Sequence, residues 1–432
     1  MSPPAVNAHV NPAPAVMPTL YQWEGGTGQW RLARTSRIVI EPAIADALRP
    51  VASRLADDVS RISGIRPVVV IADRTRRGDI GLSLAPCSDE ASQSIGGEGY
   101  TLQIGRAVSL RANTVNGVFY ATRTLLQMMI MDGPTLGMHR SAPRGYALDF
   151  PRYAERAVMF DVGRKFASVA FLENYIRFMG WYKLNTLHLH LNDQVQVKSK
   201  GKTVWFSRLF RLKSDDPAFR NLIPADGQYY TRRDWDELEA VAAANAVHIV
   251  PEIDTPGHAG AFVVARPDLA YREGSPEGGT LDPANPGSLA YIESVWEEFL
   301  PWFHSSVVHI GGDEVNNNGG HVSIAAQVDY QNHLAEFLQA HGKTVEAWGN
   351  GIGFARGLDK SLVIQRWITW GDAGKINWGR QGFQWTQSSG KWYVVPTVHG
   401  IHGGGAALYE GWSQNPENNS GRYAPSGGQI AV

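Results

Sequence analysis

The residues best suited to chemistry in this 432-residue chain lie in the run His309-Ile-Gly-Gly-Asp313-Glu314. Two neighbouring carboxylates follow two glycines, and a strand that turns at such glycines can direct both carboxylates to one ligand. Crowding of two carboxylates raises one pKa, which makes a general acid available near neutral pH. The structural alternative is a helix N-terminus, where Asp and Glu are also favoured.

Other polar and aromatic side chains follow further apolar runs of the chain. They are Asp161 and Arg164; His188, His190 and Asp193; Glu252, Asp254 and His258; Trp348; Trp367 and Trp370; and Tyr393. Burying so many polar groups in a core costs free energy unless they are paired. A binding or active site at one end of the fold therefore explains them best. Simpler roles stay open for three of them: Arg164 could pair with Asp161, His188 could pack within its strand, and Trp370 suits a core as well as a pocket.

Eight apolar runs that we interpret as β-strands precede these side chains. They cover 158–162, 186–191, 247–253, 307–310, 344–348, 362–365, one segment within 383–396, and 429–432. Helical patterns alternate with them, for example after the capping box formed by Thr231 and Asp234. Eight β-α repeats in about 280 residues favour a closed (β/α)₈ TIM barrel over a doubly wound sheet. The chemistry of such a barrel lies at the carboxyl ends of its strands.

A smaller unit precedes the barrel, which we place at residues 151–432. Residues 21–150 predict a small α/β accessory domain and a linker, with strands at 38–40, 67–71, 80–84, 100–104 and 108–110 and helices near 43–62 and 116–130. Pro134, Pro143 and Pro151 indicate the linker. Residues 1–20 are rich in Pro and Ala, which predicts a disordered leader.

Composition excludes several classes of protein. The chain has 43% apolar and 19% charged residues, with 40 basic against 41 acidic side chains, so neither disorder nor nucleic-acid binding is expected. No apolar run approaches the length of a membrane span. A single cysteine, Cys87, excludes an internal disulfide and a Cys-based zinc cluster. Trp, Tyr and Phe number 14, 15 and 15, and such flat rings pack cores and also hold sugars.

Four segments give the chain a specific resemblance. They are Val158-Met-Phe-Asp161-Val-Gly-Arg164-Lys-Phe166, Leu187-His-Leu-His190-Leu-Asn-Asp193, Pro251-Glu-Ile-Asp254-Thr-Pro-Gly257-His258, and the run ending in Asp313 and Glu314. They resemble the signature segments of glycoside hydrolase family 20, which contains β-N-acetylhexosaminidases and lacto-N-biosidases. The resemblance covers residues 35–432, because the small α/β unit is similar to the accessory domain that precedes the barrel in that family.

The resemblance implies substrate-assisted, retaining hydrolysis of terminal β-linked N-acetylhexosamine in glycans or chitooligosaccharides. The 2-acetamido oxygen of the sugar is the nucleophile, so one enzyme acid suffices. The family pattern gives Glu314 the role of general acid and base, and Asp313 and Tyr393 the role of holding the acetamide group.

The substrate-binding positions also follow from the family pattern. Arg164 would bind ring hydroxyls, and Asp193 with His258 would tune Glu314. Trp348 and Trp367 would wall the acetamide pocket, with Trp370 as a further candidate.

The expected ligand is a carbohydrate, and no metal or organic cofactor is expected. A metal site built on His188 and His190, as in a barrel amidohydrolase, is the alternative from the residues alone. Such a site needs further ligands, and only His258 and His309 offer themselves. A catalytically weak sugar-binding protein is a second alternative.

The chain also departs from the family pattern. After Asp193 it continues Gln194-Val-Gln196-Val, and the long insert up to Asp226 is more similar to the branch with lacto-N-biosidases, which release a Gal-GlcNAc disaccharide. The segment Tyr393-Val-Val395 lacks the acid that clamps an outer hydroxyl of the terminal sugar.

The end of the chain at 428–432 resembles only the beginning of the family's eighth strand, so we expect a barrel truncated there, with Trp412 as a partial substitute in the pocket. A barrel without its last helix exposes apolar surface and is expected to be less stable. The resemblance implies an extracellular or periplasmic enzyme, although the first twenty residues show no signal peptide.

Overall fold

The computed structural model describes residues 9–84, 95–131, 139–199, 202–224, 226–271, 279–315, 321–388 and 424–431. The chain divides into two compact units. The N-terminal unit comprises Met1–Arg152 with the short segments Arg177–Lys183 and Ala244–Ala246, and the barrel unit comprises the remainder.

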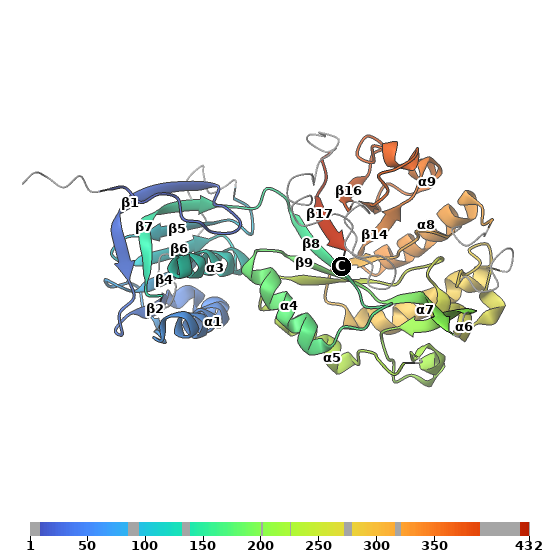
Figure 1. Ribbon diagram of the computed structural model, residues 1–432, viewed down its shortest axis with the longest axis horizontal. Helices are drawn as coiled ribbons and strands as arrows, with labels where there is room; N and C mark the ends of the chain where they lie inside the picture. Colours follow the sequence, from blue (N-terminus) through green and yellow to red (C-terminus); the bar gives the residue numbers. More distant parts are fainter. Residues whose placement is uncertain are drawn as a thin grey trace, which may run out of the picture. The chain divides into compact units, whose positions relative to one another are not determined.

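The N-terminal unit is a seven-stranded mixed sheet with two long helices, α1 (Ala45–Ser63) and α3 (Val115–Met131), on one face (Figure 1). Apolar residues of α1 recur at helical spacing, as at Leu48, Leu55 and Val59, and are buried against the sheet. In sheet order the strands are β1 (Gln22–Arg31), β7 (Ser141–Asp149), β5 (Tyr100–Ile104), β6 (Val108–Ala112), β4 (Ile80–Leu84), β2 (Arg37–Ile40) and β3 (Val68–Ile71).

Two strands of this sheet lie where the sequence predicts none. β1 contains three glycines, and β7 contains Pro143 and Gly145 in the segment expected to be a linker. The two strands pair antiparallel, with an irregularity between Gly25 and Gln29 that separates the two paired stretches. Gly145 is required because the ring of Trp23 occupies the space where a Cβ would lie. The linker prediction for this segment is therefore wrong.

The described part of the leader, residues 9–20, also differs from the expected disorder. Val10 bridges to Thr27, and Val16 is buried in the core of the unit. The backbone N–H and carbonyl of Met17 both bond to the side chain of Gln127. These contacts fix the segment although its composition lacks the usual pattern of a helix or strand.

The barrel unit is a closed ring of eight parallel strands, as the sequence predicts. They are β8 (Glu155–Asp161), β9 (Thr186–His190), β12 (His248–Glu252), β13 (Val307–His309), β14 (Thr344–Gly349), β15 (Val363–Arg366), β16 (Gln384–Gln387) and β17 (Gly427–Ala431). The expected truncation does not leave the ring open, because β17 pairs with both β16 and β8. Figure 1 shows β17 in red beside the green β8.

Helices and one hairpin connect the strands of the barrel. The helices are α4 (Val169–Trp181), α5 (Arg232–Ala243), α6 (Gly260–Ala265), α7 (Pro286–Phe299), α8 (Ile324–Ala340) and α9 (Ile352–Gly357), with short 3-10 turns η2 (Pro217–Leu222), η3 (Pro267–Leu269), η4 (Leu300–Trp302) and η5 (Ala373–Lys375). Thr231 and Asp234 exchange hydrogen bonds at the start of α5, which confirms the capping box. The insert after β9 forms the antiparallel hairpin β10 (Asn192–Ser199) and β11 (Lys202–Phe210). Among the described residues, no helix combines the length and apolar character that crossing a membrane requires.

Candidate active site

The turn after β13 places two carboxylates side by side. Gly311 and Gly312 have φ of 71° and 97°, in the left-handed region that favours glycine. A Cβ on Gly311 would overlap the carboxylate of Asp254, and one on Gly312 would overlap the side-chain amide of Gln331. The chain therefore turns sharply after the strand and delivers the next two residues, Asp313 and Glu314, to the rim.

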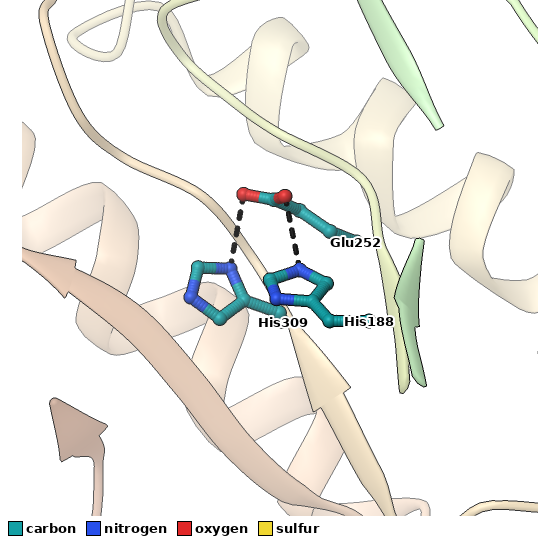
Figure 2. A group of neighbouring side chains, drawn as sticks. All are labelled: His188, Glu252 and His309. Atoms are coloured by element: carbon teal, nitrogen blue, oxygen red, sulfur yellow. Dashed lines mark ion pairs between the residues drawn. The ribbon is translucent and has the colours of Figure 1, made fainter. Parts of the chain in front are cut away.

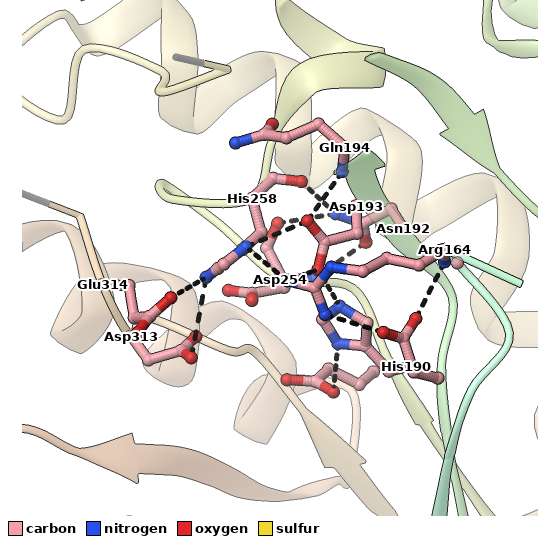
Figure 3. Close-up of polar contacts among 12 residues, drawn as sticks. Arg164, His190, Asn192, Asp193, Gln194, Asp254, His258, Asp313 and Glu314 are labelled. Atoms are coloured by element: carbon pink, nitrogen blue, oxygen red, sulfur yellow. Dashed lines mark hydrogen bonds and ion pairs between the residues drawn. The ribbon is translucent and has the colours of Figure 1, made fainter. Parts of the chain in front are cut away.

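His258 lies between these two carboxylates and a buried aspartate (Figure 3). Its Nε2 is 3.6 Å from Asp313 Oδ2 and 3.6 Å from Glu314 Oε2, and its Nδ1 is 3.0 Å from Asp193 Oδ1. Both His258 and Glu314 have φ of 49°, which L-residues with side chains seldom adopt. Backbone strain at two facing residues is typical of a functional site, where the surrounding structure enforces it.

The electrostatics of this group favour a proton on Glu314. Burial raises the pKa of Glu314, and the charge of Asp313 raises it further. Burial opposes the charged form of His258, but Asp193 and Asp313 outweigh it and raise the pKa of His258 well above its usual range. The site thus holds an imidazolium beside a carboxyl group that can donate a proton near neutral pH.

Asp193 is completely buried and collects three cationic groups. Arg164 Nη2 lies 2.6 Å and His190 Nε2 2.8 Å from its Oδ2, while His258 bonds to its Oδ1. Burial opposes ionisation of Asp193, but the charges of Arg164 and His258 lower its pKa. Arg164 also pairs with Asp161 at 2.7 Å, as the simpler interpretation expects. Its side chain stays 24% exposed, so the guanidinium still reaches the rim.

Two further residues support this arrangement: Asn192, which the sequence analysis does not select, and Asp254, which it places at the rim without a role. The Asn192 carboxamide bonds to the backbone of Asp254 through both its oxygen and its nitrogen, and also to the carbonyl of His258. Asp254 Oδ1 accepts the Gly312 N–H at 2.8 Å. Burial and then the charge of Asp313 raise the pKa of Asp254 well above its usual range. The signal for Asn192 was its position next to Asp193, directly after a strand.

Three tryptophans lie in or directly after two neighbouring barrel strands. Trp348 is in β14, and Trp367 and Trp370 follow β15. Trp348 is 3% exposed and lies edge to face with Trp367, with ring centroids 6.4 Å apart. Trp370 lies 5.5 Å from Trp367, again edge to face, and is 56% exposed. Trp370 is therefore not a core residue. The indole N–H of Trp348 donates to Glu252 Oε1 at 2.7 Å, which fixes the plane of this ring.

Two of the histidines considered for a metal site, His188 and His309, contact Glu252. His188 Nε2 lies 3.0 Å and His309 Nδ1 3.1 Å from a carboxylate oxygen of Glu252, and Figure 2 shows both rings on one side of this carboxylate. The Gln429 amide reaches His188 Nδ1, and the Gly311 N–H donates to His309 Nδ1, so these lone pairs are engaged. His188 is fully buried, as a packed strand residue should be.

The other two histidines of that hypothesis are held as cations. Burial opposes protonation of His190, but Glu252 and Asp193 outweigh it and raise the pKa well above the usual range, as the acids around His258 do for that ring. An imidazolium has no lone pair for a metal ion. Hydrogen bonds and ion pairs thus join these four histidines to the acids around them, and His188, Glu252 and His309 also lie close enough together to hold a metal ion.

Two predicted site residues lie outside the described residues. They are Tyr393, expected to hold the acetamide oxygen, and Trp412, expected as a pocket aromatic. Both stay predictions. The structure does bring together Arg164, Asp193, His258, Asp313 and Glu314, and separately Trp348, Trp367 and Trp370.

Comparisons with known proteins match both units of the chain. The model described as "Glycosyl hydrolase family 20, domain 2" matches residues 13–144, and "Glycosyl hydrolase family 20, catalytic domain" matches residues 153–400. Among solved structures, the GH20 beta-N-acetylhexosaminidase of Streptomyces coelicolor A3(2) covers 98% of this chain and is covered to 87%, with a TM-score of 0.79 and 24% identity. This likeness shows a shared fold.

Curated relatives are also distant in sequence. A beta-hexosaminidase of Vibrio furnissii is 28% identical over 335 residues, which is 71% of this chain and 52% of that protein. A lacto-N-biosidase of Bifidobacterium bifidum is 25% identical over 377 residues, which is 82% of this chain and 31% of that protein. The chain thus spans about half of the first relative and a smaller part of the second.

Proposed function

Since the chain belongs to glycosyl hydrolase family 20, we propose that it removes terminal β-linked N-acetylhexosamine from glycans or chitooligosaccharides with the sugar's own acetamide as nucleophile. The observation that carries this proposal is the group at the end of β13. Glu314 and Asp313 both lie 3.6 Å from one imidazole nitrogen of His258, and that ring is anchored to the buried Asp193.

Glu314 is suited to protonate the glycosidic oxygen. Its raised pKa keeps a proton available, and its side chain is 37% exposed, so a substrate can reach it. Once the leaving group departs, the same carboxylate deprotonates the water that opens the oxazolinium intermediate. His258 lies close enough to stabilise the carboxylate form between the two steps.

Asp313 is suited to the acetamide group. A carboxylate accepts a hydrogen bond from the acetamide N–H and offsets the positive charge that develops as the carbonyl oxygen attacks C1. The attack is intramolecular, so its rate depends on how well the acetamide is held. We assign this holding to the walls formed by Trp348 and Trp367 and to Tyr393, and the ring hydroxyls to Arg164.

Release of a disaccharide is the second candidate function. Two observations favour it: the match to the Bifidobacterium bifidum protein covers 82% of this chain, and the insert after β9 forms the hairpin of β10 and β11. A lacto-N-biosidase site must admit a galactose beyond the N-acetylglucosamine, so it needs an open side where an exo-hexosaminidase is closed.

The test uses two aryl glycosides, of β-N-acetylglucosamine and of β-lacto-N-biose, with the full chain and with Glu314→Gln. Faster release from the first supports the hexosaminidase, and faster release from the second supports the biosidase. Glu314→Gln should lose turnover by about 10²–10⁴-fold and keep its ligand affinity. A cooperatively folded chain that releases neither product, and still binds N-acetylglucosamine, is a sugar-binding protein and refutes the proposal.

A further inference from the structure

Glu252 ends β12 and is completely buried, yet the proposed mechanism gives it no role. Its carboxylate lies among three imidazoles and one indole. Oε2 is 2.6 Å from His190 Nδ1 and 3.0 Å from His188 Nε2, and Oε1 is 3.1 Å from His309 Nδ1 and 2.7 Å from the indole nitrogen of Trp348. His309 Nδ1 already accepts the Gly311 N–H, so His190 and Trp348 supply the hydrogen bonds that hold this buried carboxylate in one position.

A series of contacts links Glu252 to the general acid, and Figure 3 labels its other members, His190, Asp193, His258 and Glu314. His190 bridges Glu252 and Asp193 through its two ring nitrogens, at 2.6 and 2.8 Å. Asp193 then bonds to His258 at 3.0 Å, and His258 lies 3.6 Å from Glu314. Glu252, His190 and Asp193 are buried, so solvent does not replace the contacts among them, while His258 is 10% and Glu314 37% exposed.

A second contact leads from Glu252 to the proposed acetamide pocket. The 2.7 Å bond from the Trp348 indole fixes the rotation of this ring about its side-chain bonds. Trp348 in turn packs against Trp367. The orientation of the pocket wall and that of His190 therefore depend on the two oxygens of one carboxylate.

We propose that Glu252 is a positioning residue that couples the acid Glu314 to the acetamide wall Trp348, so that the proton donor and the nucleophile are aligned by a single buried group. This inference rests on the proposed function. It assigns Glu252 a part in both halves of the reaction without contact with the substrate.

The charges support this role. Burial opposes the ionised form of Glu252, but His190 and the two other histidines outweigh it and lower its pKa well below the usual range. His190 is held as a cation by Glu252 and Asp193, with Asp161 contributing further. A neutral isostere at position 252 would leave His190 with one carboxylate partner in place of two and would present donor hydrogens to a site that needs acceptors.

The substitution Glu252→Gln tests the proposal, with Glu346→Gln as the matched control. Glu346 is on β14, the strand that also carries Trp348, and its carboxyl group is close enough to those of Glu155 and Glu252 to be affected by their charges. Burial, together with the charges of Glu155 and Glu252, raises the pKa of Glu346 well above its usual range, so glutamine closely imitates its neutral form. Glu346 is not part of the series of side-chain contacts described above, which links Trp348 through Glu252 to Glu314. Both variants are first compared by thermal melting.

Two measurements separate the effect of Glu252 on the general acid Glu314 from its effect on the acetamide wall Trp348. A 2,4-dinitrophenyl leaving group departs without protonation, whereas a 4-methylphenyl leaving group needs the general acid. Glu252→Gln should therefore reduce kcat/KM at least about 100-fold on the 4-methylphenyl substrate. On the dinitrophenyl substrate the reduction should be about ten times smaller. It should also bind a thiazoline analogue of the intermediate at least about tenfold more weakly, because the pocket wall is released. Glu346→Gln should stay within about twofold of the wild type in both measurements.

Each outcome is decisive. If Glu252→Gln loses equally on both substrates and keeps its thiazoline affinity, the coupling does not exist. The same holds if it cannot be distinguished from Glu346→Gln. A wild-type chain that turns over neither substrate refutes the proposed function, and the inference with it. An active wild type with an unremarkable Glu252→Gln refutes the inference alone.

If Glu252→Gln does not melt cooperatively, two other variants take its place. One removes the contact from Glu252 toward Glu314, and the other removes the contact from Glu252 to the acetamide wall. His190→Gln should reduce turnover selectively on the 4-methylphenyl substrate, and Trp348→Phe should reduce both substrates equally and weaken thiazoline binding. Identical profiles for these two variants would overturn the proposal.

Discussion

Replacement of Gly311 by alanine probes whether the turn after β13 depends on the absence of a side chain. Gly311 has φ of 71°, and an added Cβ would overlap the carboxylate of Asp254. The matched control is Gly342→Ala, after α8. Gly342 has nearly the same φ, 77°, but an added Cβ there meets nothing within 4 Å. The pair therefore separates the backbone cost from the cost of the overlap.

The expected magnitudes follow from this difference. A left-handed alanine costs about 1–2 kcal/mol, partly offset by the lower entropy of the unfolded chain, so Gly342→Ala should lose about 1 kcal/mol. Gly311→Ala bears the same cost and a further 1–3 kcal/mol, roughly, for displacing packed atoms. For a domain of this size, thermal melting should fall by about 2–4 °C in the control and roughly 5–15 °C in Gly311→Ala.

The two variants should differ more in turnover than in stability. Asp254 Oδ1 accepts the N–H of Gly312, so its displacement moves the turn that carries Asp313 and Glu314. A shift of about 1 Å at reacting groups can cost on the order of 100-fold in rate. We expect that loss in kcat for Gly311→Ala on aryl β-N-acetylglucosaminide, and a change within about twofold for the control. If Gly311→Ala melts and turns over like Gly342→Ala, the close approach of Asp254 does not constrain this turn.

Three further outcomes are expected. Because the charge of Asp313 raises the pKa of Glu314, Asp313→Asn should move the alkaline limb of the kcat/KM profile to lower pH in addition to slowing the reaction; an unmoved limb would exclude this coupling. In the N-terminal unit, Arg37 lowers the pKa of the buried Asp79 despite its burial, so the pair stabilises the fold above the unfolded pKa of about 4 and loses that effect as pH falls through the folded pKa. Asp79→Asn should lower the free energy of unfolding by about 2 kcal/mol at pH 7, and a deficit that does not shrink toward pH 3 in denaturant titrations would contradict this. Chelation with EDTA should leave turnover unchanged, whereas loss of turnover that zinc restores would revive the metal hypothesis.

The sequence was most informative where one periodicity dominates. The barrel strands are short apolar runs between helical patterns, and all eight lie where those runs predict them. β1 and β7 were missed because glycine and proline usually interrupt strands. Their reason lies in a contact that is distant in sequence: the ring of Trp23 packs over Gly145 on the partner strand. Such cross-strand packing leaves no local pattern.

For the site, the sequence placed residues at strand ends but could not assign their partners. Arg164 had two plausible roles, and the structure shows it bridging Asp161 and Asp193. Glu252 was one acid among several at the rim. Its importance arises from imidazoles on β9 and β13 and an indole on β14, which only the closed barrel brings together.

Closure of the barrel has a consequence for how the chain folds during synthesis. β8 is made early, but its partner β17 comes from the far end of the barrel sequence. Until that segment leaves the ribosome, β8 and β16 are open edges, with unpaired backbone groups that can join other chains. Such distant pairing also makes folding slow. Nascent chains are therefore exposed to aggregation for most of their synthesis, and the yield of folded protein should depend on chaperones that cover these edges.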